Sequence, residues 1–252
     1  MSHARKHPLH WGAFYIRSKA YQVVRYNVWV KHKPFYLHDK HVALRLLIAL
    51  GLFMVCVVVF AKLAWDVRER ETLSFDTSLL TAIHTLSTPW LDTVARTATQ
   101  FGGSLFVPIV TLVITGWLWL KRYRNHALLI FVGVGGASVL SLALKAFFAR
   151  TRPELWQHLV HETSFSFPSG HELASAALAA SIVAALWFTR WRTVAIVVGA
   201  LYVASIGFTR LYLGVHYPTD ILAGWLVAVA WVAAVAVIFL TSPLSLKKPK
   251  TD

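Results

Sequence analysis

The stretch FSFPSGHELAS, residues 165–175, opens an apolar helix with a polar turn. Ser169 followed three residues later by Glu172 has the form of a helix-capping box. The same start leaves backbone N–H groups near Ser169, Gly170 and His171 unpaired at the positive end of the helix dipole, where an anion can bind. The stretch therefore indicates either a helix cap and nothing more, or an anion site at the mouth of a bilayer-spanning helix.

The rest of the chain has the composition of a membrane protein. Its 252 residues are 57% hydrophobic and 14% charged, and the mean hydropathy is +0.57. Apolar runs of about 20 residues are long enough to cross a bilayer as helices. We therefore expect an all-α integral membrane bundle of six transmembrane helices. The predicted spans cover about 43–64, 104–120, 127–148, 172–189, 193–213 and 219–241.

The distribution of Lys and Arg predicts the orientation, because basic loops remain in the cytoplasm. Basic residues dominate 1–45, the 121–126 and 190–192 turns and the tail, which all fall on one side of six helices. Acidic residues outnumber basic ones in 65–103, where one or two short helices at the interface should break near Pro89. We expect a multi-pass protein of the inner membrane with both termini cytoplasmic and this segment extracytoplasmic.

The chain divides into three predicted parts. Residues 1–40 form a basic, aromatic segment, either an amphipathic helix on the inner leaflet or a partly disordered leader. Residues 41–242 form the membrane domain, and residues 243–252 form a basic cytoplasmic tail. The first forty residues hold no apolar core typical of a cleavable signal peptide. The formal net charge is +14, but the basic residues lie beside the spans, which favours anionic lipids over nucleic acid as partners.

A second polar cluster, LKAFFARTRPELW, closes the third predicted span. Lys145 and Arg152 are two helical turns apart, so they share a face if the helix continues that far. Pro153 disfavours helix at the preceding residue and predicts an end there. Lys145 alone would be explained by a side chain that reaches the interface, whereas the pair indicates a cationic site.

The third cluster, GFTRLYLGVHYPTDILAG, joins the last two spans. Arg210 closes the fifth span, and Asp220 lies in the first turn of the sixth, after Pro218. Asp220 follows His216 by four residues and can orient the imidazole so that its other nitrogen attacks a substrate. The alternative is that Asp220 only complements the helix dipole and His216 lies in the interface. The predicted topology brings all three clusters to the extracytoplasmic face, where ionisable groups at helix ends indicate function.

Together the motifs K-x6-RP from Lys145, PSGH ending at His171, and Arg210 with His216 and Asp220 resemble the type 2 phosphatidic acid phosphatase superfamily, in its bacterial membrane form. The resemblance covers about residues 43–241. One departure is Thr209, because the family often has Ser before this arginine.

The resemblance implies a metal-independent lipid phosphate phosphatase that hydrolyses lipid phosphate mono- or diesters at the extracytoplasmic face through a phosphohistidine. His216 would be the nucleophile, Asp220 would orient it, and His171 would serve as general acid and then as base. Their opposed protonation states predict a bell-shaped pH profile near 6.5. Undecaprenyl diphosphate is the favoured substrate, followed by phosphatidate and phosphatidylglycerophosphate. The residues expected to bind phosphate are Lys145, Arg152, Ser169, Gly170 and Arg210.

Other functions remain open at this stage. A phosphotransferase would use the same histidine with another lipid as acceptor, and a lipid transporter or scramblase would only bind headgroups. The vanadate-dependent haloperoxidases resemble the family at the same motifs but are soluble. No set of His, Cys, Asp and Glu has metal-ligand spacing, so we expect no metal and no cofactor. His126, His158 and His161 are expected at the surface, and the lipid tail and oligomeric state stay undetermined.

Overall fold

A computed structural model describes residues 40–241 of the chain. Every regular element in this part is a helix, as the sequence predicts. The predicted basic segment 1–40, apart from its last residue, and the predicted tail 243–252 lie outside the described residues.

Each of the six predicted spans coincides with one helix, with ends that differ by a few residues. Long apolar runs favour this result. The six helices are α2 (Lys40–Arg68), α5 (Phe106–Leu120), α6 (Arg124–Phe148), α7 (Gly170–Leu186), α8 (Arg192–Tyr212) and α9 (Pro218–Thr241).

Fewer than six of these helices are long and apolar enough to cross a membrane on their own. Four are long and apolar enough, namely α2, α6, α8 and α9. The 15 residues of α5 pair with the helices that precede it across a bend of 42°, which makes a fifth candidate. The 17 residues of α7 form a shorter apolar helix. By length and composition, the described residues therefore contain four spans, or up to five.

Two short helices and a turn of 3-10 helix connect α2 to α5, as expected for 65–103. They are α3 (Leu73–His84), α4 (Pro89–Thr99) and η1 (Gln100–Gly102). Proline at the first position of α4 suits a helix start, and the Thr88 hydroxyl accepts a hydrogen bond from the Leu91 N–H at 3.3 Å. The predicted break near Pro89 therefore lies between the end of α3 at His84 and the start of α4 at Pro89.

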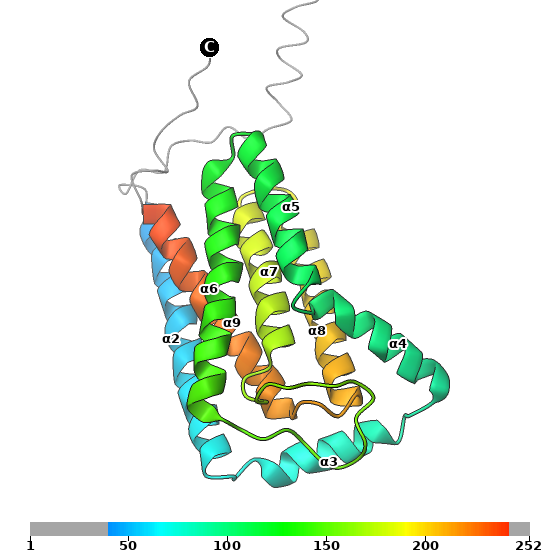
Figure 1. Cartoon of the computed structure of the whole chain (residues 1–252). Helices are drawn as coiled ribbons and strands as arrows, with labels where there is room; N and C mark the ends of the chain where they lie inside the picture. The colour runs from blue at the N-terminus through cyan, green and yellow to red at the C-terminus, as the bar shows by residue number, and fades with distance from the viewer. Residues whose placement is uncertain (1–39, 242–252) are drawn as a thin grey trace, which may run out of the picture. The chain divides into compact units, whose positions relative to one another are not determined.

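Helix α9 lies at the centre of the packing and contacts α2, α6 and α7 (Figure 1). Leu173, Ala177 and Val232 belong to the apolar core between α7 and α9. On α6, a side chain at Gly136 would collide with the ring of Trp231, so glycine permits this close helix contact. Large apolar side chains on α2 point outward, as expected for a surface that meets lipid.

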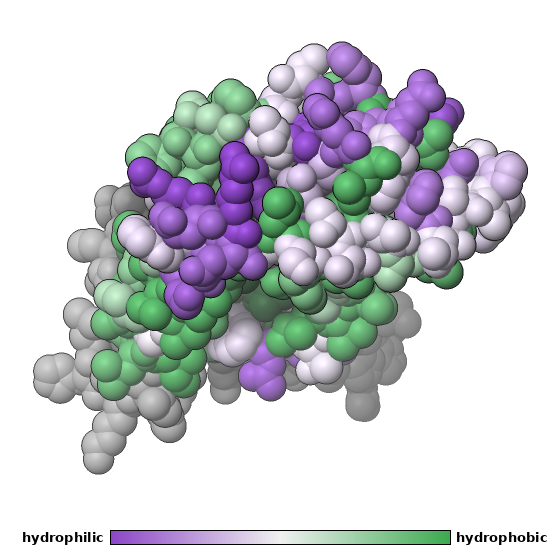
Figure 2. All heavy atoms as spheres, turned by 90° about the horizontal axis from the view of Figure 1, so that it is seen from below, coloured by the Kyte–Doolittle hydropathy of each residue, from purple (hydrophilic) through white to green (hydrophobic). Residues whose placement is uncertain are grey.

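Three helices end and two begin at the same end of this bundle, next to α3 (Figure 1). The helices α2, α6 and α8 end there, and α7 and α9 begin there. We call this the α3 end. Figure 2 looks onto it and shows hydrophilic residues gathered there, with hydrophobic residues around them. The alternation of helix direction thus brings the three polar clusters of the sequence to one end of the bundle.

Candidate active site

His216 is the centre of the site and lies on the short loop between α8 and α9. Its side chain is only 1% exposed. The Nδ1 atom lies 3.3 Å from Oδ2 of Asp220, in the first turn of α9. The Nε2 atom lies 3.1 Å from a terminal guanidinium nitrogen of Arg152. This arrangement fits the tautomer with the proton on Nδ1. The Nε2 lone pair then accepts a hydrogen bond from Arg152, and it can attack an electrophile when that guanidinium turns to a substrate.

Burial lowers the pKa of His216 well below its ordinary value of 6.5. The positive charges of Arg210, Arg152, Lys145 and His171 lower it further. The imidazole is therefore neutral near pH 7, as a nucleophile must be. Among the predicted site residues, Arg152 and Asp220 contact this imidazole directly.

The predicted cations Lys145 and Arg152 do converge, but not through a shared helix face. Helix α6 ends at Phe148, and Ala149 adopts a left-handed conformation with φ of 46°, so Arg152 lies on the loop beyond. The condition for a shared face, a helix that continues to Arg152, is not met, because the helix ends one turn earlier. The loop itself returns Arg152 to the site, where its guanidinium donates to the Val215 carbonyl at 2.7 Å.

The start of α7 does not form the predicted capping box. The Ser169 side chain makes no capping hydrogen bond, and its buried Oγ has no partner in the part of the chain that the structure describes. Oε2 of Glu172 instead accepts a hydrogen bond from Trp225 Nε1 on α9, at 2.5 Å. The reciprocal bond from the carboxylate to the cap is thus replaced by a contact between α7 and α9.

The backbone at this helix start is only partly available to an anion. The N–H of Ser169 donates to the Asp220 carbonyl at 3.0 Å. The N–H groups of Gly170 and His171 have no partner within residues 40–241. A Cβ atom placed on Gly170 would lie 3.5 Å from Cε of Lys145, so the Lys145 side chain lies beside this helix start.

The bend between η1 and α5 lies against His171. A Cβ atom placed on Gly103 would lie 3.6 Å from Nε2 of this imidazole.

The hydroxyl of Thr209 donates to the Ile206 carbonyl within α8 at 2.7 Å. Thr209, the departure from the family pattern, therefore uses its hydroxyl inside its own helix.

A carboxylate that the sequence did not predict occupies the site between two arginines. Glu162 is ion-paired with Arg210, which is 1% exposed, and its other oxygen lies 3.5 Å from Arg152. Burial raises the pKa of Glu162, but Arg210 and Arg152 lower it to about 2 in total. The carboxylate is therefore ionised at neutral pH, and the two arginines hold it as an anion.

Asp76 and Arg150 are further residues that the sequence analysis missed. Arg150 donates to Oδ1 of Asp220 at 2.6 Å and to Oδ2 of Asp76 at 2.8 Å. Asp76 lies on α3, is fully buried and accepts a bond from the Thr219 N–H at 3.1 Å. Arg150 stands two positions before Arg152 in ARTRP, but no sequence spacing links it to a carboxylate 74 residues away.

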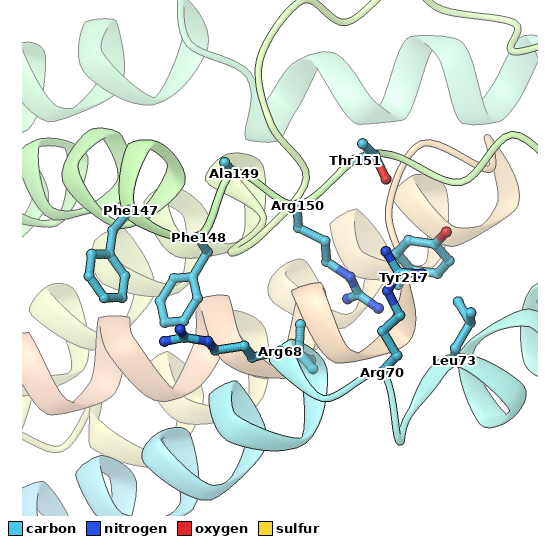
Figure 3. A pocket seen from close by; sticks show the side chains of 10 residues that line it. Arg68, Arg70, Leu73, Phe147, Phe148, Ala149, Arg150, Thr151 and Tyr217 are labelled. Atoms are coloured by element: carbon cyan, nitrogen blue, oxygen red, sulfur yellow. The ribbon is translucent and has the colours of Figure 1, made fainter.

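A cavity of about 670 Å³ lies beside the site. Arg68, Arg70, Arg150 and Tyr217 are among its lining residues (Figure 3). None of the predicted site residues lines it.

The structure also bears on the histidines outside the motifs and on metal binding. His161 is exposed, as predicted, whereas His126 and His158 are half-buried, contrary to the prediction. Nε2 of His158 is buried with no partner in the described part of the chain. Within residues 40–241, no group of three or more His, Cys, Asp or Glu side chains could hold a metal ion.

Comparison with known proteins identifies relatives that share both sequence and fold. The family model of the PAP2 superfamily matches residues 126–243. Phosphatidylglycerophosphatase B of Bacillus subtilis (strain 168) is 30% identical over 66% of this chain and 84% of its own length. Undecaprenyl-diphosphatase of Sulfolobus acidocaldarius is 25% identical over 78% of this chain and 92% of that protein.

A solved structure gives the same result for the fold. The crystal structure of a transmembrane PAP2 type phosphatidylglycerolphosphate phosphatase from Bacillus subtilis is similar with a TM-score of 0.68 and 28% identity. The similarity covers 73% of this chain and 93% of that one. The matched family region includes all three polar clusters that meet around His216.

Proposed function

Because this chain belongs to the PAP2 superfamily, we propose that it hydrolyses the terminal phosphate of a membrane lipid through a phosphohistidine formed on His216. The chain is a membrane protein whose relatives are named as phosphatases of lipid phosphates. The observation that carries the mechanism is the position of His216, with Nδ1 against Asp220 and Nε2 beside Arg152.

In the proposed first step, Nε2 of His216 attacks phosphorus and the bond from phosphorus to the lipid oxygen breaks. His171 donates a proton to the departing oxygen. Asp220 accepts the hydrogen bond from Nδ1 and stabilises the positive charge that forms on the imidazole. The second step reverses these roles, because His171 removes a proton from water, water attacks phosphorus, and the bond to Nε2 breaks.

Three cations and the start of α7 would stabilise the phosphoryl oxygens. Arg152 and Arg210 already hold the Glu162 carboxylate, and Lys145 lies beside Gly170. An arriving phosphoryl group would replace Glu162 between the arginines. Its oxygens would accept hydrogen bonds from the N–H groups of Gly170 and His171. Ser169 contributes a buried Oγ that has no partner among the described residues.

We place the α3 end on the extracytoplasmic side of an inner membrane, with α2 and α5 to α9 as six spans. The turns at the other end of the bundle carry Lys121, Arg122, Arg124, Arg190 and Arg192, and basic loops remain in the cytoplasm. In this arrangement, α4 and α5 cross as one bent span, and the short α7 spans between longer neighbours. The site then opens where a lipid headgroup lies.

The lipid itself is to be found by comparison of three substrates. Undecaprenyl diphosphate, phosphatidylglycerophosphate and phosphatidate all present a terminal phosphate to His216. The two relatives described above are named for the second and the first of these lipids, respectively. The arginines contact only the phosphate in this mechanism, so the apolar surfaces of the helices must distinguish the tails.

The test is phosphate release from each of the three lipids by the purified protein in mild detergent with a chelator present. His216→Ala is the blank, and trapping of acid-labile, base-stable radioactive phosphate on the wild type identifies the phosphohistidine. Release that depends on His216 supports the proposal, and the ratio of rates ranks the lipids. No release without a second lipid as acceptor would replace hydrolysis by phosphotransfer, and unchanged release by His216→Ala would overturn the mechanism.

A further inference from the structure

We infer that Arg150 and Asp76 are positioning residues, which hold Asp220 and the His216 loop in the geometry for attack without touching the phosphoryl group. Their role rests on the proposed function of His216 as nucleophile. Asp76 lies outside the three sequence motifs, and Arg150 is at one of the variable positions of K-x6-RP. They reach the site from α3 and from the loop after α6.

Arg150 holds the chain at two positions that follow His216, namely Tyr217 and Asp220. Its guanidinium donates to Oδ1 of Asp220 at 2.6 Å, which leaves Oδ2 for the imidazole. The same guanidinium lies over the ring of Tyr217, 4.1 Å from the ring centroid (Figure 3). Tyr217 directly follows His216, and its N–H donates to Oδ2 of Asp220. One arginine thereby fixes both the carboxylate and the loop that must remain aligned with it.

Asp76 fixes Arg150 and the start of α9 at the same time. This fully buried carboxylate accepts a bond from Arg150 at 2.8 Å. It also accepts bonds from the Thr219 N–H at 3.1 Å and the Thr219 hydroxyl at 2.7 Å. Thr219 is the second residue of α9, so its N–H has no partner within the helix. Asp76 therefore caps, from α3, the helix turn that carries Asp220.

The charges explain why Arg150 positions other groups and does not bind phosphate. Two buried carboxylates, Asp76 and Asp220, already pair with its guanidinium. Arg152 and Arg210 instead share a single carboxylate, Glu162, which an incoming phosphate can replace. Loss of an Arg150 contact should therefore weaken the alignment of His216 and leave phosphate affinity unchanged.

Asp76→Asn is the decisive variant, because it keeps the shape of the side chain and an acceptor for Thr219 but removes the charge that holds Arg150. We expect kcat to fall about 10- to 100-fold, as for small displacements of a reacting group, while KM stays within about threefold. The matched control is Asp92→Asn on α4, where Oδ1 accepts from the Tyr212 hydroxyl at 2.5 Å and no bond leads to Asp220. The control should retain both constants.

Conservative replacement separates positioning from a purely structural role. Arg150→Lys keeps a charge beside Asp220 and should retain more kcat than Arg150→Gln. A fall in thermal stability with kcat unchanged, or an equal loss in the lysine and glutamine variants, would overturn the inference. A rise in KM with kcat unchanged would also overturn it, because that result assigns Arg150 to substrate binding.

A second measurement does not depend on turnover. Nitrogen NMR of histidine-labelled protein, with His216→Gln to assign the signal, reports which ring nitrogen of His216 carries the proton. We expect Nδ1–H in the wild type and a mixture of tautomers in Asp76→Asn and Arg150→Gln, with Asp220→Asn as reference for a lost partner. An unchanged tautomer in both variants would overturn the inference. If the wild type hydrolyses no lipid, the proposed function fails but these spectra still decide whether Asp76 and Arg150 orient His216.

Discussion

Glu162 is ion-paired with Arg210 inside the site, where the proposed mechanism requires a phosphate. The other oxygen of the same carboxylate lies near Arg152. A buried guanidinium without an anion is unfavourable, so the loop carboxylate stabilises the empty site. The substrate phosphate must compete with it, which makes Glu162 a determinant of affinity.

Glu162→Gln should therefore bind substrate more tightly. Removal of the competing charge leaves Arg210 and Arg152 free for the phosphoryl oxygens, so we expect KM and the inhibition constant of inorganic phosphate to fall about 3- to 10-fold. The melting temperature should fall in the absence of phosphate and recover when phosphate is added. Steady-state kinetics and thermal melting with and without phosphate test both effects.

The matched control is Glu154→Gln, an exposed glutamate on the same loop. It should change neither KM nor the melting temperature. If Glu162→Gln raises KM, the carboxylate instead helps to arrange the arginines for substrate, and its role as a competitor is excluded.

The pKa of His216 predicts where activity is lost in acid. Burial and the neighbouring cations hold this pKa below 6.5, so the imidazole takes up its inactivating proton only below that pH. The acidic limb of kcat/KM should have its midpoint below pH 6.5. The unfolded chain takes up this proton at a higher pH than the folded chain does. The free energy of unfolding should therefore fall as the pH drops below 6.5.

The measurement is kcat/KM from pH 4 to 8, with samples returned to pH 7 to exclude irreversible unfolding. A midpoint at or above 6.5 would show that His216 is not the group whose protonation limits the reaction, or that the substrate phosphate outweighs the surrounding cations.

The sequence predicted most of the fold and of the site because both depend on local signals. Apolar runs located the six helices, and their alternating direction brought His171, His216 and the cations to one end. Motif residues were found because each stands beside a helix end that the pattern marks. Lengths were less certain, since the crossing predicted over 104–120 corresponds to α5 alone, which passes as a span only together with the preceding α4 and η1.

Tertiary pairing could not be predicted in the same way. Asp76 and Arg150 meet across 74 residues, and Glu162 meets Arg210 across 48. No helical period connects such partners. The capping box failed for a related reason, because Trp225 on α9 offers Glu172 an N–H that the local pattern does not contain.

Thr99 on α4 is expected to hold the Arg210 guanidinium in place. Its hydroxyl accepts a bond from the Arg210 guanidinium at 2.9 Å, and the residue is buried. Thr99→Val keeps the volume but leaves this N–H unpaired, so kcat/KM should fall about tenfold or more, the effect of a lost hydrogen bond to a charged group. Thr99→Ser should restore activity.

The control for Thr99 is Thr111→Val on α5, where the hydroxyl donates only to the Val107 carbonyl of its own helix. The measurement is kcat/KM of Thr99→Val, Thr99→Ser and Thr111→Val with the best lipid substrate, compared with the wild type. Equal activity in Thr99→Val and wild type would show that Arg210 is held without Thr99.

Gly214 should be irreplaceable on the loop that carries His216. Its φ of 69° lies in the left-handed region, which costs an L-residue about 1–2 kcal/mol. A Cβ atom there would also lie 2.7 Å from the ring of Trp156, so alanine must displace either that ring or the loop. We expect Gly214→Ala to lower the melting temperature and to reduce kcat about 10- to 100-fold, because the displaced loop takes His216 out of line with Asp220.

Gly116→Ala on α5, where a Cβ meets nothing within 4 Å, should match the wild type in both measurements. Full activity in Gly214→Ala would mean that the loop tolerates displacement and that the contact with Asp220 alone aligns His216.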